Sequence, residues 1–527
     1  MTTYRTNDSR RRSLFVSSAL ERCALSPIMM PRKILAAALA TVVLGGCAIH
    51  PRPITDDERK ASMQADAQAM FGEQEPVAAP ITLDEAMARA LKYNLDHRVK
   101  MMEEALAQRQ LDLANFDLLP QLTAAAGYTS RDNVLASSSQ DIVTGQQSLV
   151  PSTSSQRQAT RADLGFSWNI LDFGVSYYTA QQQADRVLAT AERRRKVVQL
   201  LMQQTRQAYW QAAGAQKLQG QIEPLLTQAR QALDDSHAIE TKGLSDPLQS
   251  LGYQRELLSL VLQLESIRDE LAQAKPKLAS IMNLPPGKPF ELAPPDALDT
   301  PTLAIAPEAM EETALLHRPE LIEANYNERI GLNETHKALA KLLPGVQLSV
   351  GAHYDSNDFL VNNSWRDAGV QVSWNLLNLL NAKNIKGAAK AQYELAREQR
   401  LALNMAVLTQ VHVAWIDYDS RRQQFELTRD LNDVEQRILE HTRNATNANA
   451  QGKLADIRAA TSALMSELRL YQSYAAYQGA YGQMIASLGL DPVPNAVAGH
   501  DLPTLEKAIA DTEKQWERPQ VTEAAAK

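Results

Sequence analysis

Three segments of the chain alternate strictly between apolar and polar side chains: residues 163–170, 346–354 and 369–376. In the second segment, Val, Leu, Val, Ala and Tyr occupy the even positions, and Gln, Ser, Gly and His occupy the odd ones. Because successive side chains of a strand point to opposite faces, this pattern predicts β-strands with one apolar and one water-facing side. Polar segments 131–160 and 355–367 are predicted to be exposed loops between paired strands. Two hairpins give four strands, which are too few to close a barrel without further chains.

A helical segment precedes each pair of strands, and a much longer one follows it. The preceding segments, Leu83–Leu118 and Pro307–Leu342, end just before a proline, and Pro319 is predicted to break or kink the second. Residues 175–241 contain one proline and residues 381–490 contain none. A continuous helix over the first of these ranges would be about 100 Å long.

The long helical regions are predicted to reverse direction at Gly243 and Gly452 and to pack as coiled coils. Apolar residues recur at alternating intervals of four and three positions, after Gly243 and again before Gly452. These intervals are the heptad spacing of coiled coils. Pro276 predicts a kink in the first seam. The first seam comprises Leu260, Leu264, Ile267, Leu271, Ala274, Leu278 and Ile281, and the second comprises Leu427, Leu431, Val434 and Ile438.

The same order of elements occurs twice, which indicates an internal duplication. Matching positions are 205 to 209 residues apart, except for the Leu-Pro pairs, which are 224 apart because the first copy has a longer stretch before its Trp. The matches are Leu119-Pro120 with Leu343-Pro344, Trp168 with Trp374, Trp210 with Trp415, Gly243 with Gly452, and Asn283-Leu284 with Gly489-Leu490. The predicted divisions are a signal sequence (1–46), an N-terminal linker with a short helix near residues 58–70 (47–80), the first repeat (81–290), an inter-repeat linker (291–306), the second repeat (307–492) and a C-terminal tail (493–527).

Composition narrows the class of protein. The net charge of -7 argues against a nucleic-acid binder, whose affinity comes from a basic surface. The mean hydropathy is -0.32, and no apolar run of about 18 residues follows residue 50, which argues against a bundle of membrane-spanning helices. A membrane β-barrel is compatible with these values, because its alternating strands give a weak hydropathy signal. Cys23 and Cys47 are the only cysteines, so a disulfide framework is excluded.

The N-terminal region has the architecture of a secretory signal. A basic opening, Met30–Lys33, precedes an apolar stretch, Ile34–Leu44, and the small residues before Cys47. Residues 1–28 are interpreted as upstream of a start at Met29 or Met30. The segment before Cys47 resembles the lipobox of bacterial lipoproteins, which implies a diacylglycerol and an N-acyl lipid (palmitate) on that cysteine and an outer-membrane address. An uncleaved apolar anchor is the alternative.

No catalytic motif occurs in the chain. The nine histidines form no H-E-x-x-H spacing, and there is no G-x-S-x-G, phosphate-binding P-loop or dinucleotide-binding glycine motif. We therefore expect no enzyme activity, no cofactor other than the lipid, and no metal site.

Aromatic residues on the apolar face of the predicted strands have two interpretations. They could fill the core of a β-sandwich, or they could form an interfacial girdle on a lipid-facing barrel. Short side chains on the opposite face, Gly165, Ser167, Gly351 and Ser373, favour a water-filled lumen. The aromatic residues are Tyr128, Phe166, Trp168, Tyr354 and Trp374.

The lipobox, the duplicated unit and the Leu-Pro junctions together resemble the TolC-like outer-membrane factors over about residues 80 to 492. The resemblance implies an α+β membrane β-barrel with a long coiled-coil helical barrel, built by a trimer in which each chain gives four of 12 strands. It also implies a passive duct that works with a periplasmic adaptor (a membrane fusion protein) and an inner-membrane pump of RND or ABC type.

In this family the turns between the long helices form the periplasmic tip, where the adaptor docks and the aperture closes. The corresponding residues are Gly243, Leu244, Ser245, Gly452, Lys453 and Leu454. A tight reversal requires a positive φ angle, which explains the two glycines. Docking of the adaptor at these turns is what the resemblance implies, and a plain helix C-cap is the alternative interpretation.

The sequence departs from the family at two places. Family members commonly carry an acid six positions after the tip glycine, whereas this chain has Gln249 and Arg458 there. Asp246 and Asp456 are the nearest acids, and pairing of Arg458 with an acid of a neighbouring helix is a gating hypothesis. The second strand-to-helix junction, Asn378-Leu379-Leu380, lacks the glycine of Asp172-Phe173-Gly174.

These observations predict a trimeric outer-membrane channel lipoprotein, the exit duct of an efflux or type I export system. A lipid-anchored periplasmic coiled-coil scaffold without a channel is the alternative, and a periplasmic lipoprotein enzyme is disfavoured by the missing motifs. The pattern does not distinguish cargoes. Small-molecule efflux is expected from its frequency in the family, with secretion next.

Overall fold

The computed structural model describes residues 51–242, 246–295, 297–303, 305–448, 452–494 and 497–516. The signal sequence, Cys47 and the tip residues Gly243, Leu244 and Ser245 lie outside these ranges. The chain divides into a unit ending at Asp66 and a second unit, Ala67–Lys527. Helix α2 (Asp56–Phe71) confirms the short helix predicted in the linker. It starts with a capping box in which the Glu58 amide donates to the Thr55 hydroxyl and the Glu58 carboxylate accepts from the Thr55 amide.

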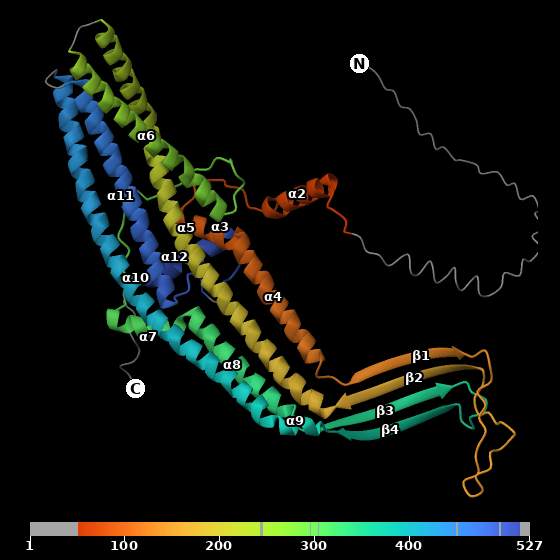
Figure 1. Ribbon diagram of the computed structural model, residues 1–527. Helices are drawn as coiled ribbons and strands as arrows, with labels where there is room; N and C mark the ends of the chain where they lie inside the picture. Colours follow the sequence, from red (N-terminus) through yellow and green to blue (C-terminus); the bar gives the residue numbers. More distant parts are fainter. Residues whose placement is uncertain are drawn as a thin grey trace, which may run out of the picture. The chain divides into compact units, whose positions relative to one another are not determined.

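The second unit contains one antiparallel sheet in the order β1-β2-β3-β4 (Figure 1). Its strands are β1 (Gln121–Ser130), β2 (Gln158–Asn169), β3 (Gly345–Asp355) and β4 (Ser364–Ser373). The pairing of β2 with β3 joins the hairpins of the two copies, and each of β1 and β4 has one edge without a strand partner in the described chain. The second strand of each hairpin, β2 or β4, has bounds that are shifted toward the N-terminus relative to the predicted ones. Both strands begin inside the expected loops, and β4 ends before Trp374, because Asn375 already caps the next helix.

Long helices lead away from the sheet and return (Figure 1). The first copy contains α5 (Ile170–Thr241) and α6 (Pro247–Ile281), and the second contains α10 (Ala382–Asn447) and α11 (Lys453–Leu488). The predicted long helices are therefore confirmed. Helix α5 continues through Pro224.

Shorter helices precede the sheet in each copy. They are α3 (Leu83–Tyr93) and α4 (Leu95–Phe116) in the first copy, and α7 (Pro307–His317) and α8 (Pro319–Ala340) in the second. The break predicted at Pro319 is confirmed. The first copy is also broken, at Asn94, where the sequence predicted one continuous helix. The Asn94 side chain accepts a hydrogen bond from the His97 amide at 3.1 Å and so caps a new helix.

The two strand-to-helix junctions differ, as the missing glycine suggested. In the first copy, Asn169 caps α5 and the helix starts at once after β2. In the second copy, Asn375 caps only the short helix α9 (Leu376–Leu380), which ends before α10 begins. Asn381 separates these two helices.

Both return helices end in the same backbone motif, at positions that the duplication equates. Asn283 (φ 56°) follows α6 and Gly489 (φ 74°) follows α11, both in the left-handed region. The next amides, of Leu284 and Leu490, donate back to the fifth carbonyl before them, as in a Schellman motif. A side chain at Gly489 would also meet the backbone of His317 within 2.6 Å, so glycine is required there.

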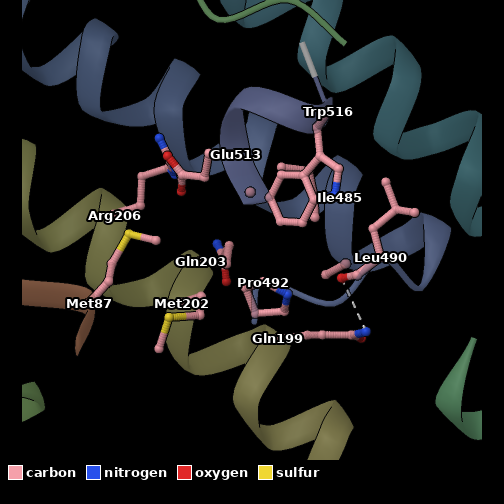
Figure 2. A pocket seen from close by; sticks show the side chains of 12 residues that line it. Met87, Gln199, Met202, Gln203, Arg206, Ile485, Leu490, Pro492, Glu513 and Trp516 are labelled. Carbon is pink, nitrogen blue, oxygen red and sulfur yellow. Dashed lines mark hydrogen bonds and ion pairs between the residues drawn. The ribbon is translucent and has the colours of Figure 1, made fainter. Parts of the chain in front are cut away.

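The segment predicted to be a C-terminal tail contains a packed helix, α12 (Leu502–Trp516). Its buried residues recur at helical spacing, so the signal was present but short. Figure 2 shows Trp516 and Glu513 of α12 in a pocket with Met87 of α3 and Arg206 of α5. The buried face of α12 consists of Leu502, Leu505, Ile509, Thr512 and Trp516.

The hydrophobic core lies between the long helices. Leu264, Ile267, Leu271 and Leu278 of α6 are buried against α5 and α11, which confirms the first coiled-coil seam. The second seam is different, because all four of its residues are exposed in the single chain. Leu427 is 70%, Leu431 40%, Val434 48% and Ile438 47% exposed.

Candidate functional site

The strand register gathers small and polar side chains on one face of the sheet. Gly165 pairs with Gly351, Ser167 with Ser349, and Gly345 with Ser373. The charged residues of this face lie in the half of the sheet nearer the loops. They are Arg161, Asp163, His353, Asp355 and Asp367.

The opposite face carries four of the five predicted aromatic residues. Tyr128 and Tyr354 lie near the loops and Trp168 lies near the helices, with Phe166 in between. Trp374 follows the end of β4, on the helix side of the sheet. All are exposed except Trp168, which is half-buried. In the described part of the chain the sheet is single, so these aromatics do not form the core of a sandwich.

The described residues of the predicted tip, Gly452, Lys453 and Leu454, have different environments. Gly452 precedes α11 with φ -87° and ψ 161°, an extended conformation open to any residue, so the expectation of a positive φ was wrong there. Leu454 packs against the hydrophobic core between the long helices α5, α6 and α11. Lys453 lines a cavity of about 440 Å³ together with Asp235 and Tyr253 of the first copy.

The three aperture candidates do not meet within one chain. The Asp246 carboxylate caps α6 by accepting from the Leu248 amide at 2.8 Å. Asp456 lies 3.6 Å from Arg443 of α10. Arg458 contacts α6, so the sequence identified the type of its partner, an acid of a neighbouring helix, but not the residue.

Two polar contacts connect α6 of the first copy with α11 of the second. Arg458 Nε donates to Glu256 Oε1 at 2.6 Å, and Gln472 Nε2 donates to Glu270 Oε1. On each helix the two residues are 14 positions apart, which is two heptads. These two contacts repeat with the coiled-coil period, and they therefore fix the position of helix α6 along helix α11.

A buried charged cluster fixes α12 at the start of the first copy. Arg206 forms an ion pair with Glu513 and donates to Gln478 Oε1 at 2.9 Å. Burial, reinforced by the negative charge of Glu513, raises the pKa of the Asp84 carboxyl to about 6. The sequence pattern does not reveal this cluster, because its members come from four separate segments of the chain.

Within the described ranges, no helix is long and apolar enough to cross a membrane.

Part of the chain matches a family of known proteins, and several curated proteins are similar to it. The family model described as "Outer membrane efflux protein" matches residues 86–284. The toluene efflux pump outer membrane protein TtgC of Pseudomonas putida is 24% identical over 384 residues, covering 70% of this chain and 76% of the relative. The antibiotic efflux pump outer membrane protein ArpC of Pseudomonas putida is 24% identical over 335 residues, covering 61% and 66%. Together these matches support the predicted TolC-like outer-membrane factor.

Solved structures show that this chain has the fold of outer-membrane channels. The CmeC channel of Campylobacter jejuni aligns with a TM-score of 0.61 at 14% identity, covering 84% of this chain and 94% of that one. The MtrE channel of Neisseria gonorrhoeae aligns with a TM-score of 0.59 at 15% identity, covering 77% and 89%. The predicted TolC-like fold and the outer-membrane location are confirmed, and the scaffold without a channel is not supported.

Proposed function

We propose that this protein is a homotrimeric channel lipoprotein and the exit duct of a tripartite pump. Its partners would be a periplasmic adaptor and an inner-membrane transporter of RND or ABC type. The observation that carries the proposal is a four-stranded sheet whose two outer edges have no partner strand in the described chain. Its second strand leads into a helix of 72 residues, and its fourth leads, through the short helix α9, into one of 66 residues.

Unpaired strand edges in a membrane are costly, because their N–H and C=O groups find no partner in hydrocarbon. Pairing β4 of one chain with β1 of the next satisfies these groups, and three chains close a barrel of 12 strands. The apolar face with its aromatic residues then contacts lipid, and the polar face lines the lumen. The exposed seam on α10 supports the same assembly, since a neighbouring chain would cover it.

The mechanism is passive conduction, with the energy supplied by the inner-membrane transporter. Small toxic organic compounds are the proposed cargo, which the relatives named for toluene and antibiotic efflux support. A lipid on Cys47 would hold each chain at the outer membrane.

The adaptor would dock at the tip. The cavity of about 440 Å³ beside Lys453 is a groove formed by both copies and offers apolar and charged groups to a partner helix. The Arg458–Glu256 contact lies on the same helices and would hold the two hairpins together in the closed state. Opening would require this contact to break.

Site-specific photocrosslinking in intact cells tests the assignment of partners. A photoreactive residue at Lys453 should capture the adaptor, whereas the same residue at the exposed Lys386, near the sheet, should not. Co-purification of a proton-driven RND pump would identify an efflux outlet, and co-purification of an ATP-driven exporter would identify a secretion outlet. A purified protein that is monomeric and captures neither partner would contradict the proposal.

A further inference from the structure

One histidine on the polar face of the sheet lies between two carboxylates from neighbouring strands. His353 Nδ1 is 2.6 Å from Asp163 Oδ1 of β2, and its Nε2 is 3.2 Å from Asp367 Oδ2 of β4. The Trp365 ring stacks on the imidazole, with the centroids 5.1 Å apart and the planes 19° from parallel. This position is specific to the second copy, because the first hairpin has no histidine.

The backbone is shaped to accept the imidazole. Gly351, two residues earlier on the same face, lies beneath the ring, and a Cβ there would collide with His353 Nε2 and lie 2.7 Å from Asp367 Oδ1. A glycine is therefore needed for the ring to lie flat between the carboxylates.

The geometry fits the charged form of the ring. Nδ1 shares a hydrogen bond with Asp163 Oδ1, whereas Nε2 has no hydrogen-bond partner among the described residues and faces Asp367 Oδ2 at ion-pair distance only. A charged ring is attracted to both carboxylates, whereas a neutral ring keeps only the hydrogen bond to Asp163. Histidine is the side chain whose ordinary titration falls in the physiological range. The other charged groups on this face, Arg161 of β2 and Asp355 of β3, neutralise each other in an ion pair at 2.8 Å. The remaining charge is thus set by His353, Asp163 and Asp367.

We propose that the Asp163–His353–Asp367 cluster determines the charge selectivity of the outer half of the channel, making it cation-preferring, and that protonation of His353 weakens this preference. The inference rests on the proposed trimer, in which the polar face lines the lumen. Each chain then contributes a net charge of minus one when the ring is protonated and minus two when it is neutral. The side chain of His353 is 23% exposed, so lumen water and ions reach it.

Reversal potentials in planar bilayers test this inference. Full-length trimers are inserted from one side under a KCl gradient, and the pH is changed only in the chamber that faces the strand loops. The cation-to-anion permeability ratio of the wild type should be about twofold higher at pH 8 than at pH 5, because the lumen gains negative charge. His353→Asn should remove this pH dependence. His412→Asn, which alters a histidine paired with Glu311 on the helices, should retain it.

The carboxylates provide a second measurement that does not depend on the histidine variant folding. Asp163→Asn and Asp367→Asn should each lower the cation preference at both pH values. Wild-type channels whose ratio equals that of His353→Asn at both pH values would overturn the inference and leave the channel function intact. If the purified wild type forms no channel, the proposed function and the inference both fail.

Discussion

The two copies carry the same heptad spacing but use it for different interfaces. In the first copy, Leu257 and Leu264 of α6 are completely buried between α5 and α11. In the second copy, Leu427 and Val434 of α10 point away from the chain's own core and are half-exposed or more. An apolar seam shows that a helix has a partner, but the spacing does not say whether the partner belongs to the same chain. Exposure in the folded chain decides this.

The largest effect should come from charging the exposed seam. Leu431→Asp combined with Val434→Asp would place carboxylates where the proposed neighbour packs, removing about 1.5–3 kcal/mol of apolar burial per side chain and adding the cost of burying charge. We expect complete loss of the trimer with retained helix content, measured by light scattering and circular dichroism in detergent.

The buried seam provides the contrast. Leu264→Ala should lower the free energy of unfolding by about 2–5 kcal/mol, because it leaves a cavity in the core of the first copy. If the exposed-seam variant instead unfolds, or remains trimeric, the two seams do not differ as described.

A second difference between the copies is electrostatic. The first copy buries Arg206, with the half-buried Asp84 close to it. The second copy has Val411 at the position that matches Arg206, in an apolar cluster with Met310 and Leu321. The copy that binds the C-terminal helix therefore contains a carboxyl whose raised pKa makes the stability of the chain depend on pH.

Asp84→Asn measures that dependence. The pKa of Asp84 is raised from 3.8 to about 6, so its neutral form favours the folded state. This contribution is fully present below pH 3.8 and is lost as the pH rises through about 6. The variant should be more stable than the wild type by about 1–2 kcal/mol at pH 7.5, after allowing for partial exposure, and equal to it below pH 4. Denaturant unfolding at the two pH values measures the difference, and an equal difference at both would contradict the assignment.

The smallest effect should come from the contact that joins the copies. Arg458→Ala removes a half-exposed ion pair with Glu256, worth at most about 1 kcal/mol, so closed-state leak in bilayers should rise about fivefold or less. Glu256→Ala should match it. Arg421→Ala, which breaks a pair within α10 alone, is the control. Unchanged leak and conductance in Arg458→Ala would remove the gating hypothesis.

Local signals predicted much of this fold. Strand alternation, Pro319 and the absence of prolines from residues 381–490 are local features of the sequence, and each corresponds to an observed element. The pairing of β2 with β3 and the partner of Arg458 were not predictable, because they depend on how two distant hairpins align. The break at Asn94 and the helix α12 had short signals that could have been found, namely an asparagine cap and a single amphipathic face.

The two strand hairpins of the sheet differ strongly in the length of the loop that connects their strands. Residues 131–157 link β1 to β2, whereas residues 356–363 link β3 to β4. The longer connection extends as a ribbon, with backbone bridges between Ser137 and Ser152 and between Gln140 and Gln147. In a trimer facing the outside of the cell, the hairpins repeat six times around the axis but this ribbon only three times. Each channel would therefore present three identical ribbons to antibodies or phages, and an epitope tag inserted into the ribbon would be displayed three times.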